Sequence, residues 1–254
     1  MMSTALLSVD NVSKHFLGLR AVDGVSLSVQ QGEIVSIIGP NGAGKTTLFN
    51  LLTGQLSPTA GDVFFKGQRI NQLPPHDRAR LGMGRTFQIS KPLIALTALE
   101  NVMIGAFLHH HDMQEACDRA IGVLERVGLK YLARRRAGDL TLSERRRLEV
   151  ARALALEPEI VLLDEVMAGL NQSEVGQAID LLKGLHAEGH TFLIIEHNLK
   201  VVRAFSERVV VLDRGRWIGE GSAEEILTSP DVIKAYLGDG HIGSQGEQAQ
   251  GVAV

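Results

Sequence analysis

Short apolar runs bounded by turn residues indicate strands near both ends of the chain. Apolar and polar residues alternate over residues 9–12 and 22–29, which is typical of strands that bury one face. Runs that are apolar at nearly every position, as expected of parallel strands buried on both faces, occur at 34–38, 160–163 and 191–195. Because helical or loop segments separate these runs, the pattern predicts an α/β core with an antiparallel β portion at the N-terminus.

Shorter segments complete the predicted core. Prolines at positions 74 and 75 break the chain before a short helix that is expected to begin at Arg78. A strand is expected to start at Met83 and to end at Gln88. The other predicted elements are a strand at 63–65, helices at 48–52, 173–186 and 223–227, and a hairpin of 208–212 with 216–219.

The middle of the chain has a different pattern. Its apolar residues follow helical spacing, which predicts an α-helical subdomain, at about 89–157, inserted into the core. One helix is expected over 113–127. The next begins with a capping box, in which Thr141 is the N-cap and Glu144 reaches back to it, and it ends before Pro158.

Residues 1–238 are expected to form one domain with this helical insertion. The remainder, 239–254, is rich in Gly and Gln and has no periodicity. Such a composition does not supply enough apolar surface for a packed core, so we expect a flexible tail there.

Composition narrows the class of protein. The chain has 254 residues, of which 44% are hydrophobic and 22% charged, as in ordinary globular proteins. A formal net charge of −3 gives no general attraction to nucleic acid, and no apolar run approaches the roughly 20 residues that span a bilayer. The single cysteine, Cys117, excludes an intrachain disulfide and a cysteine-rich metal site. The first ten residues lack the pattern of a secretory signal, so we expect a cytosolic protein that reaches a membrane only through a partner.

The strongest chemical signal is the sequence GPNGAGKTT at residues 39–47. It fits the phosphate-binding pattern G-x-x-x-x-G-K-[ST], between a predicted strand and a predicted helix. The glycines let backbone N–H groups turn toward an anion, and the following helix adds the positive end of its dipole. Lys45 is expected to reach the β- and γ-phosphates and Thr46 to hold Mg²⁺. The residues predicted to contact the nucleotide here are Gly39, Asn41, Gly42, Gly44, Lys45, Thr46 and Thr47.

Acidic and imidazole side chains follow two of the buried strands. Asp164 is predicted to hold Mg²⁺ through water, and Glu165 to polarise the attacking water as a general base. His197 follows the strand at 191–195, where a neutral imidazole can bond to the γ-phosphate or to the water. Each residue alone would more often be structural. Together with the phosphate loop, they favour hydrolysis of a nucleoside triphosphate.

In this order the motifs resemble those of the ATP-binding subunits of ABC transporters, over about residues 7–238. The resemblance implies a P-loop NTPase (RecA-like) α/β core. It also implies that Phe16 stacks on adenine, with packing in the core as the alternative. Gln88 matches the glutamine that contacts Mg²⁺ and relays motion to the membrane domain, residues 168–171 match the D-loop, and His197 matches the switch histidine.

The segment that corresponds to the family's L-S-G-G-Q motif is altered, and reads Leu-Thr-Leu-Ser-Glu at residues 140–144. In that family the segment contacts ATP held by a partner subunit, so the resemblance implies this contact for Thr141 and Ser143. The helix that Thr141 begins still presents N–H groups to an anion. Glu144 would repel the γ-phosphate unless it turns back into its capping box. Val166 replaces the proline that commonly follows the catalytic glutamate. ATP binding is still expected, and the hydrolysis rate is left open.

Within the family, the chain is similar to the ATP-binding subunits of branched-chain amino-acid importers, at residues 19–23, 85–88, 146–149, 195–197 and 233–238. The resemblance implies import of amino acids powered by ATP and Mg²⁺, at the cytoplasmic face of the inner membrane. The implied partners are integral membrane permease subunits, a second ATP-binding subunit and, indirectly, an extracellular solute-binding protein. Because these segments do not contact the solute, lipopolysaccharide export or transport of another solute is an alternative.

Two functions from other classes of protein remain as alternatives. A soluble ABC ATPase that acts on DNA or ribosomes typically carries a coiled-coil insertion or a second nucleotide domain, and this chain has a single phosphate loop. The arginines at 134–136 and 145–147 are interpreted as solvated helix faces, with no nucleic-acid partner. A regulatory subunit that binds ATP without turnover is suggested by the altered segment 140–144 and opposed by the intact catalytic residues.

Overall fold

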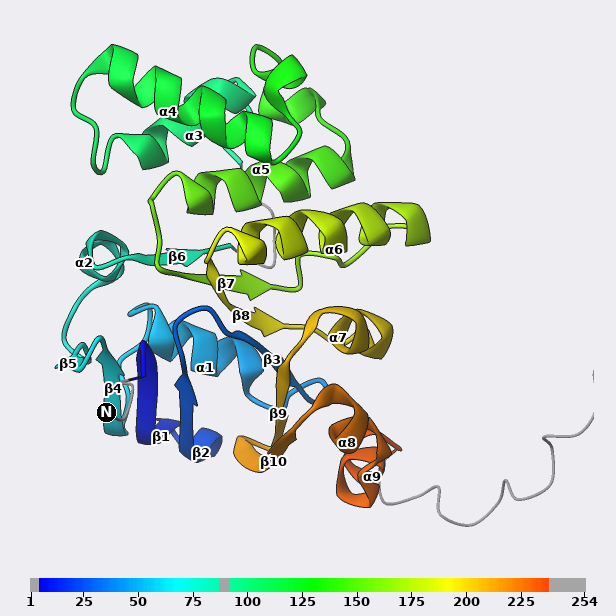
Figure 1. The fold of residues 1–254 in the computed structure, drawn as a ribbon. Helices are drawn as coiled ribbons and strands as arrows, with labels where there is room; N and C mark the ends of the chain where they lie inside the picture. The colour runs from blue at the N-terminus through cyan, green and yellow to red at the C-terminus, as the bar shows by residue number, and fades with distance from the viewer. Residues whose placement is uncertain (1–4, 87–91, 238–254) are drawn as a thin grey trace, which may run out of the picture.

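In the described part of the chain, the larger of two sheets has six strands in the order β10-β9-β3-β8-β7-β6 (Figure 1). The computed structural model describes residues 5–86 and 92–237. Strands β6, β7, β8, β3 and β9 are parallel, and β10 is antiparallel to β9. The strands are β3 (Ile34–Ile38), β6 (Met83–Arg85), β7 (Ile160–Asp164), β8 (Thr191–Ile195), β9 (Arg208–Asp213) and β10 (Arg216–Gly221). Every residue of β3, β7 and β8 is buried, which confirms the parallel strands expected from the apolar runs.

The smaller sheet is antiparallel and has the order β2-β1-β4-β5. Its strands are β1 (Leu7–Phe16), β2 (Leu19–Val29), β4 (Ala60–Phe65) and β5 (Gln68–Arg69). Helix α1 (Lys45–Leu52) follows the loop after β3, and its buried side chains share one core with apolar residues of both sheets. Because α1 is packed from both sides, the loop that precedes it is held in a fixed place.

Three helices from the middle of the chain pack against one another at the end of the molecule farthest from the small sheet (Figure 1). They are α3 (Ala98–Ala106), α4 (Met113–Arg126) and α5 (Leu142–Leu154). Their apolar residues share a second core with helix α6 (Gln172–Ala187) and with residues of β7 and β8. Within residues 5–86 and 92–237, no helix has both the length and the apolar character that a membrane span requires.

Differences from the predicted elements occur mainly at prolines. Helix α2 (Pro75–Arg80) begins at Pro75 and not at Arg78, because a proline is well tolerated in the first turn, where its missing N–H would have no partner. For the same reason Pro230 begins a helix, α9 (Pro230–Leu237), which the pattern does not predict. Helix α7 (Leu199–Phe205) is also not predicted. Helix α8 (Ala223–Thr228) corresponds to the helix predicted at 223–227. The predicted end of the β6 strand at Gln88 and the tail at 239–254 lie outside the described residues.

Arg78 of α2 is the largest of the fully buried side chains among the described residues. Its guanidinium donates to the carbonyl oxygens of Leu51 and Leu52, at 2.7 Å each, at the C-terminal end of α1. Further acceptors are the carbonyl oxygens of Ile70, Asn71 and Leu73. Burial lowers the pKa of Arg78 to about 10, so the group is still a cation at neutral pH. That charge complements the negative end of the α1 dipole.

Arg78→Met is expected to lower the free energy of unfolding by about 3–5 kcal/mol, because several buried carbonyl groups lose their donor. Urea denaturation followed by circular dichroism measures the change. Arg80→Met, on the exposed face of the same helix, is the control and should change stability by less than about 0.5 kcal/mol. Equal stability of the Arg78→Met and wild-type proteins would contradict this role.

Candidate active site

The phosphate loop, residues 39–47, runs from the end of β3 into α1 and contains positions that only glycine fits. Gly39 has a φ of 150° and Gly44 a φ of 98°. A Cβ atom on Gly39 would lie 2.1 Å from the carbonyl oxygen of Leu212, and one on Gly44 would lie 2.3 Å from the carbonyl oxygen of Ala21. Both distances are shorter than any real Cβ contact. Strands β9 and β2 therefore press directly on the loop backbone and determine its curled shape.

The turn between β9 and β10 is hydrogen-bonded to the phosphate loop and supports it. The Gly215 N–H donates to the carbonyl oxygen of Ala43 at 3.0 Å, and the Gly215 carbonyl accepts from the Asp23 N–H at 2.8 Å. Arg216 adds an ion pair to Asp23 at 2.9 Å, and its hydrogen bond lowers the pKa of Asp23. Segments distant in sequence thus hold the loop.

Lys45, the first residue of α1, is buried, with 7% of its surface exposed. Its ammonium donates to the carbonyl oxygens of Gly39 at 2.7 Å and Pro40 at 3.0 Å. Burial lowers the pKa of Lys45, and the charges of Glu165 and Asp164 act in the opposite direction. The ammonium therefore donates to uncharged carbonyl oxygens of its own loop. The charged oxygens of a phosphate group would be stronger acceptors.

A cleft of about 550 Å³ opens along the loop. Glu165 lines it, as do Arg20 on β2 and Arg214 in the β9–β10 turn. Among the loop residues predicted to contact a nucleotide, Asn41, Gly42 and Thr46 are exposed, Gly44 and Thr47 are half-buried, and Gly39 is buried. The structure therefore places an anion-binding loop, cationic side chains and a carboxylate around one opening.

Phe16 ends β1 and is 42% exposed. The ammonium of Lys14 lies 5.3 Å from the centroid of its ring. A ring with this exposure is not a core side chain, which favours the stacking role over the packing alternative.

Asp164, the last residue of β7, is 1% exposed. Its Oδ2 lies 3.3 Å from Nη2 of Arg85, and its backbone N–H donates to the hydroxyl of Thr86 at 3.2 Å. Burial raises the pKa of Asp164, and the charge of Arg85 acts against this increase. Its Oδ1 is also buried and accepts no hydrogen bond from the described residues. Because Mg²⁺ prefers carboxylate and water oxygens, a buried carboxylate oxygen with spare acceptor capacity fits this ion.

Glu165 comes next, with a φ of 50°, a conformation that residues with side chains rarely adopt. Hydrogen bonds hold it on both sides: its N–H donates to the Ile195 carbonyl at 3.0 Å, and its carbonyl accepts from the Ala168 N–H at 3.1 Å. Its Oε1 lies 3.8 Å from Nδ1 of His197. The predicted general base and the predicted switch histidine are thus neighbours beside the phosphate loop.

The capping box at the start of α5 is confirmed. The Thr141 hydroxyl accepts from the Glu144 N–H at 3.3 Å, and a Glu144 carboxylate oxygen accepts from the Thr141 N–H at 2.8 Å. The carboxylate of Glu144 is therefore turned back onto its own helix terminus. This geometry reduces the repulsion that an acid at this position would exert on a phosphate.

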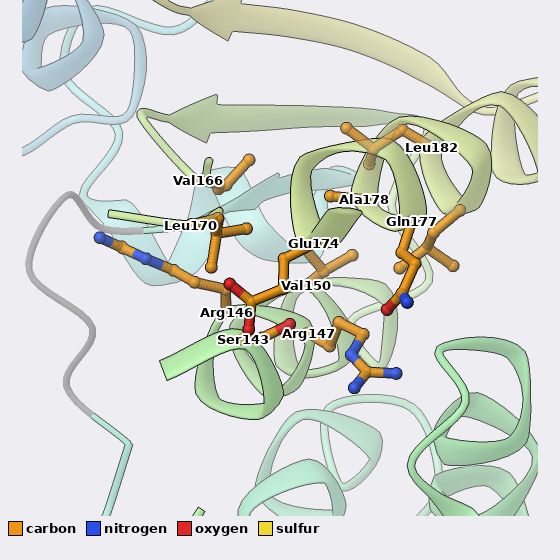
Figure 2. Close-up of a pocket in the computed structure, with 11 residues that line it drawn as sticks. Ser143, Arg146, Arg147, Val150, Val166, Leu170, Glu174, Gln177, Ala178 and Leu182 are labelled. Carbon is orange, nitrogen blue, oxygen red and sulfur yellow. The ribbon is translucent and has the colours of Figure 1, made fainter. Parts of the chain in front are cut away.

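Ser143 is 8% exposed and lines a small cavity between α5 and α6 (Figure 2). Figure 2 shows apolar side chains, including Val150 and Leu182, around the cavity, and the guanidinium groups of Arg146 and Arg147 pointing away from each other. About 20 Å³ of the cavity is open to the centre of a water molecule, which is room for about one water. The Ser143 side chain thus lies on the inner face of α5, so we expect any contact with a nucleotide to come from its backbone N–H.

The structure adds residues that sequence reasoning missed. Arg85 and Thr86 both contact Asp164, and neither is assigned a role by the motif pattern. Their position becomes meaningful only when β6 is known to pair with β7, where Arg85 is opposite Leu162. Gln88 lies outside the described residues, so its predicted contact with Mg²⁺ stays a prediction.

Comparisons with known proteins agree with this site. A sequence model of the family described as ABC transporter matches residues 22–168, and one described as branched-chain amino acid ATP-binding cassette transporter matches residues 218–242. The chain is 41% identical to the high-affinity branched-chain amino acid transport ATP-binding protein LivG of Salmonella typhimurium, over 94% of this chain and 100% of the relative. The identity and both coverages are the same for the corresponding protein BraF of Pseudomonas aeruginosa.

Solved structures give the same result. A nucleotide-free ATP-binding cassette from an ABC transporter has a TM-score of 0.85 and 33% identity, covering 93% of this chain and 100% of that one. A dimeric ATP-binding cassette in a post-hydrolysis state, bound to ADP and Pi, has a TM-score of 0.78 and 29% identity, covering 85% of this chain and 98% of that one. The predicted P-loop NTPase fold is confirmed. The chain therefore belongs to the ABC transporter family, as an ATP-binding subunit that hydrolyses ATP.

Proposed function

We propose that this chain powers the import of branched-chain amino acids through integral membrane permease subunits. The observation that carries the proposal is 41% identity, over nearly the whole chain, to branched-chain amino acid transport ATP-binding proteins. The clustering of Lys45, Asp164 and Glu165 supports the hydrolytic part of the proposal, because these groups can bind phosphates, hold a cation and activate water.

Each residue of the site then has a role. Lys45 binds the β- and γ-phosphates, and the loop's N–H groups bind the remaining phosphate oxygens. Thr46 and Asp164 would hold Mg²⁺, with Gln88 as a third contact, and the ion supplies positive charge that offsets the charge of the phosphates. Glu165 accepts a proton from the attacking water, and His197, 3.8 Å from it, orients the water or the γ-phosphate. Phe16 stacks on the adenine.

The proposed assembly explains why the site is open on one side. Two ATP-binding subunits, identical or different, pair head to tail, so that the phosphate loop of one and the α5 N-terminus of the other, at Thr141 and Ser143, enclose each ATP. Binding of ATP closes the pair, and hydrolysis opens it. The domain at 1–238, with its helical subdomain at 89–157, would pass this motion to permeases at the cytoplasmic face of the inner membrane, which receive solute from an extracellular solute-binding protein.

Uptake of labelled leucine tests the proposal. Cells whose other leucine carriers have been deleted would carry either the wild-type protein or Lys45→Ala, with the solute-binding protein present. Leucine uptake is expected to fall to background in the variant, whereas uptake of a labelled sugar should not change. Unchanged leucine uptake, with ATPase activity of the purified wild-type protein verified, would assign the ATPase to another solute or to lipopolysaccharide export.

A further inference from the structure

Arg85 occupies a buried place between the phosphate-loop helix and the end of β7. Its side chain is 9% exposed. Nη1 donates to the side-chain oxygen of Asn50 at 2.8 Å and to the hydroxyl of Thr53 at 2.7 Å, both on or next to the last turn of α1. Nη2 lies 3.3 Å from Oδ2 of Asp164. One guanidinium therefore links the helix that carries Lys45 to the strand that ends in Asp164.

We propose that Arg85 is a positioning residue for the metal site: it fixes the Asp164 carboxylate relative to α1, so that Oδ1 is available to the ion. The inference rests on the proposed role of Asp164 in holding Mg²⁺. In support, the two carboxylate oxygens are in different environments. Oδ2 is engaged by Arg85, whereas Oδ1 is buried and receives no hydrogen bond from the described residues. A carboxylate held by one oxygen cannot rotate freely, and a metal ligand gains affinity when its orientation is fixed in advance.

The contacts around Arg85 form a connected chain. The Thr53 hydroxyl donates its proton to the Phe49 carbonyl at 2.7 Å, which leaves an oxygen lone pair to accept from Arg85. The guanidinium carbon lies 5.9 Å from the centroid of the Phe49 ring. Arg85 is therefore held by α1 through polar contacts and a ring face at the same time.

The side-chain chemistry explains why an arginine suits this place. A planar guanidinium presents donors in fixed directions, so one group can bond to α1 and to Asp164 together. A lysine ammonium keeps the charge, but it is a single compact centre on a flexible stem. Arg85→Lys therefore separates the effect of geometry from the effect of charge.

The test measures metal binding directly. Binding of Mn²⁺, as a spectroscopic substitute for Mg²⁺, to the protein–ADP complex would be followed by the electron paramagnetic resonance signal of free Mn²⁺. In Arg85→Lys the Mn²⁺ dissociation constant is expected to rise by about 10- to 100-fold, the usual effect of removing an outer partner of a metal ligand. The dissociation constant of ADP without metal should stay within about twofold of wild type, because the phosphate loop is untouched.

Other variants separate positioning from stability. Thr53→Val removes one α1 partner of Arg85 at nearly constant volume. It should also raise the Mn²⁺ dissociation constant, but by less than Arg85→Lys does. Arg78→Lys is the matched control, because Arg78 is also a buried arginine bonded to α1 and makes no contact with Asp164. It should lower thermal stability and leave Mn²⁺ affinity unchanged. Circular dichroism melts of all variants show which proteins are folded at the assay temperature.

The possible outcomes distinguish this inference from the proposed function. If Asp164→Asn loses Mn²⁺ affinity while folded Arg85→Lys and Thr53→Val both bind Mn²⁺ like wild type, Arg85 has no positioning role. If Asp164→Asn itself binds Mn²⁺ normally, the proposed metal role of Asp164 is wrong, and the inference fails with it. An equal loss of Mn²⁺ affinity in Arg78→Lys would also overturn the inference, because disturbance of α1 alone would then explain the effect.

Discussion

Lys45→Ala protein is expected to lose ATP turnover by a factor on the order of 100 or more, with its fold intact. The Lys45 ammonium is the buried cation of the phosphate loop and lies 2.7 Å from the Gly39 carbonyl oxygen. During phosphoryl transfer, negative charge develops on the phosphate oxygens, and a positive charge already in place stabilises that state more than it stabilises bound ATP. Phosphate release at saturating ATP and Mg²⁺ measures the loss.

Lys66→Ala is the matched control, because Lys66 is a partly exposed lysine that pairs with Glu159 away from the cleft. It should hydrolyse ATP at the wild-type rate. The melting temperature of Lys45→Ala should not fall, because the desolvation cost of burying the Lys45 cation outweighs its attraction to Glu165 and Asp164. Wild-type turnover in Lys45→Ala would overturn the proposed mechanism.

Much of the core could be predicted because its signals are local. Strands β3, β7 and β8 are buried on both faces, and each is therefore a continuous apolar run in the sequence. The start of α5 could be predicted from Thr141 and Glu144 alone, since a capping box is a contact between residues three positions apart. The helices of the middle third follow from spacing in the same way.

Features that depend on contacts between distant segments could not be predicted. A glycine is required at position 39 because the Leu212 carbonyl oxygen lies close to it. The sequence around Gly39 gives no sign of this contact, since Leu212 is far away along the chain. The partners of Arg85 lie on α1 and β7, so its importance appears only with the order of strands in the sheet. The left-handed backbone of Glu165 is also imposed by neighbours, through the Ile195 carbonyl and the Ala168 N–H.

In the altered segment at 140–144, the capping box changes the effect that Glu144 is expected to have on a phosphate. An acid in place of the usual glutamine predicts repulsion of a phosphate, if only charge is considered. In the structure the Glu144 carboxylate accepts the Thr141 N–H at 2.8 Å, and so it is partly neutralised by the positive end of α5. The capping box does not use the N–H groups of Leu142 and Ser143, which leaves them for an anion at the start of α5.

Glu165→Gln protein is expected to form a stable dimer with ATP and Mg²⁺ and to turn ATP over about 100- to 10,000-fold more slowly than wild type. A glutamine has nearly the same shape as the glutamate, so it can occupy the strained backbone position. Its backbone keeps the hydrogen bond to the Ile195 carbonyl and the one from the Ala168 N–H. It cannot accept a proton from water. Binding therefore continues while the chemical step fails, and the closed pair accumulates. Size-exclusion chromatography with light scattering measures the mass.

Two controls make the result specific. ADP in place of ATP should leave Glu165→Gln monomeric, because without a γ-phosphate the α5 N-terminus of the second subunit has no anion to bind. Glu159→Gln, a change of the same kind at a partly exposed glutamate outside the cleft, should hydrolyse ATP normally and form no stable dimer. If Glu165→Gln is monomeric at high protein concentration with ATP and Mg²⁺, two copies of this chain do not close on ATP. In that case the active pair requires a different ATP-binding subunit, or the segment at 140–144 has lost its contact with the nucleotide.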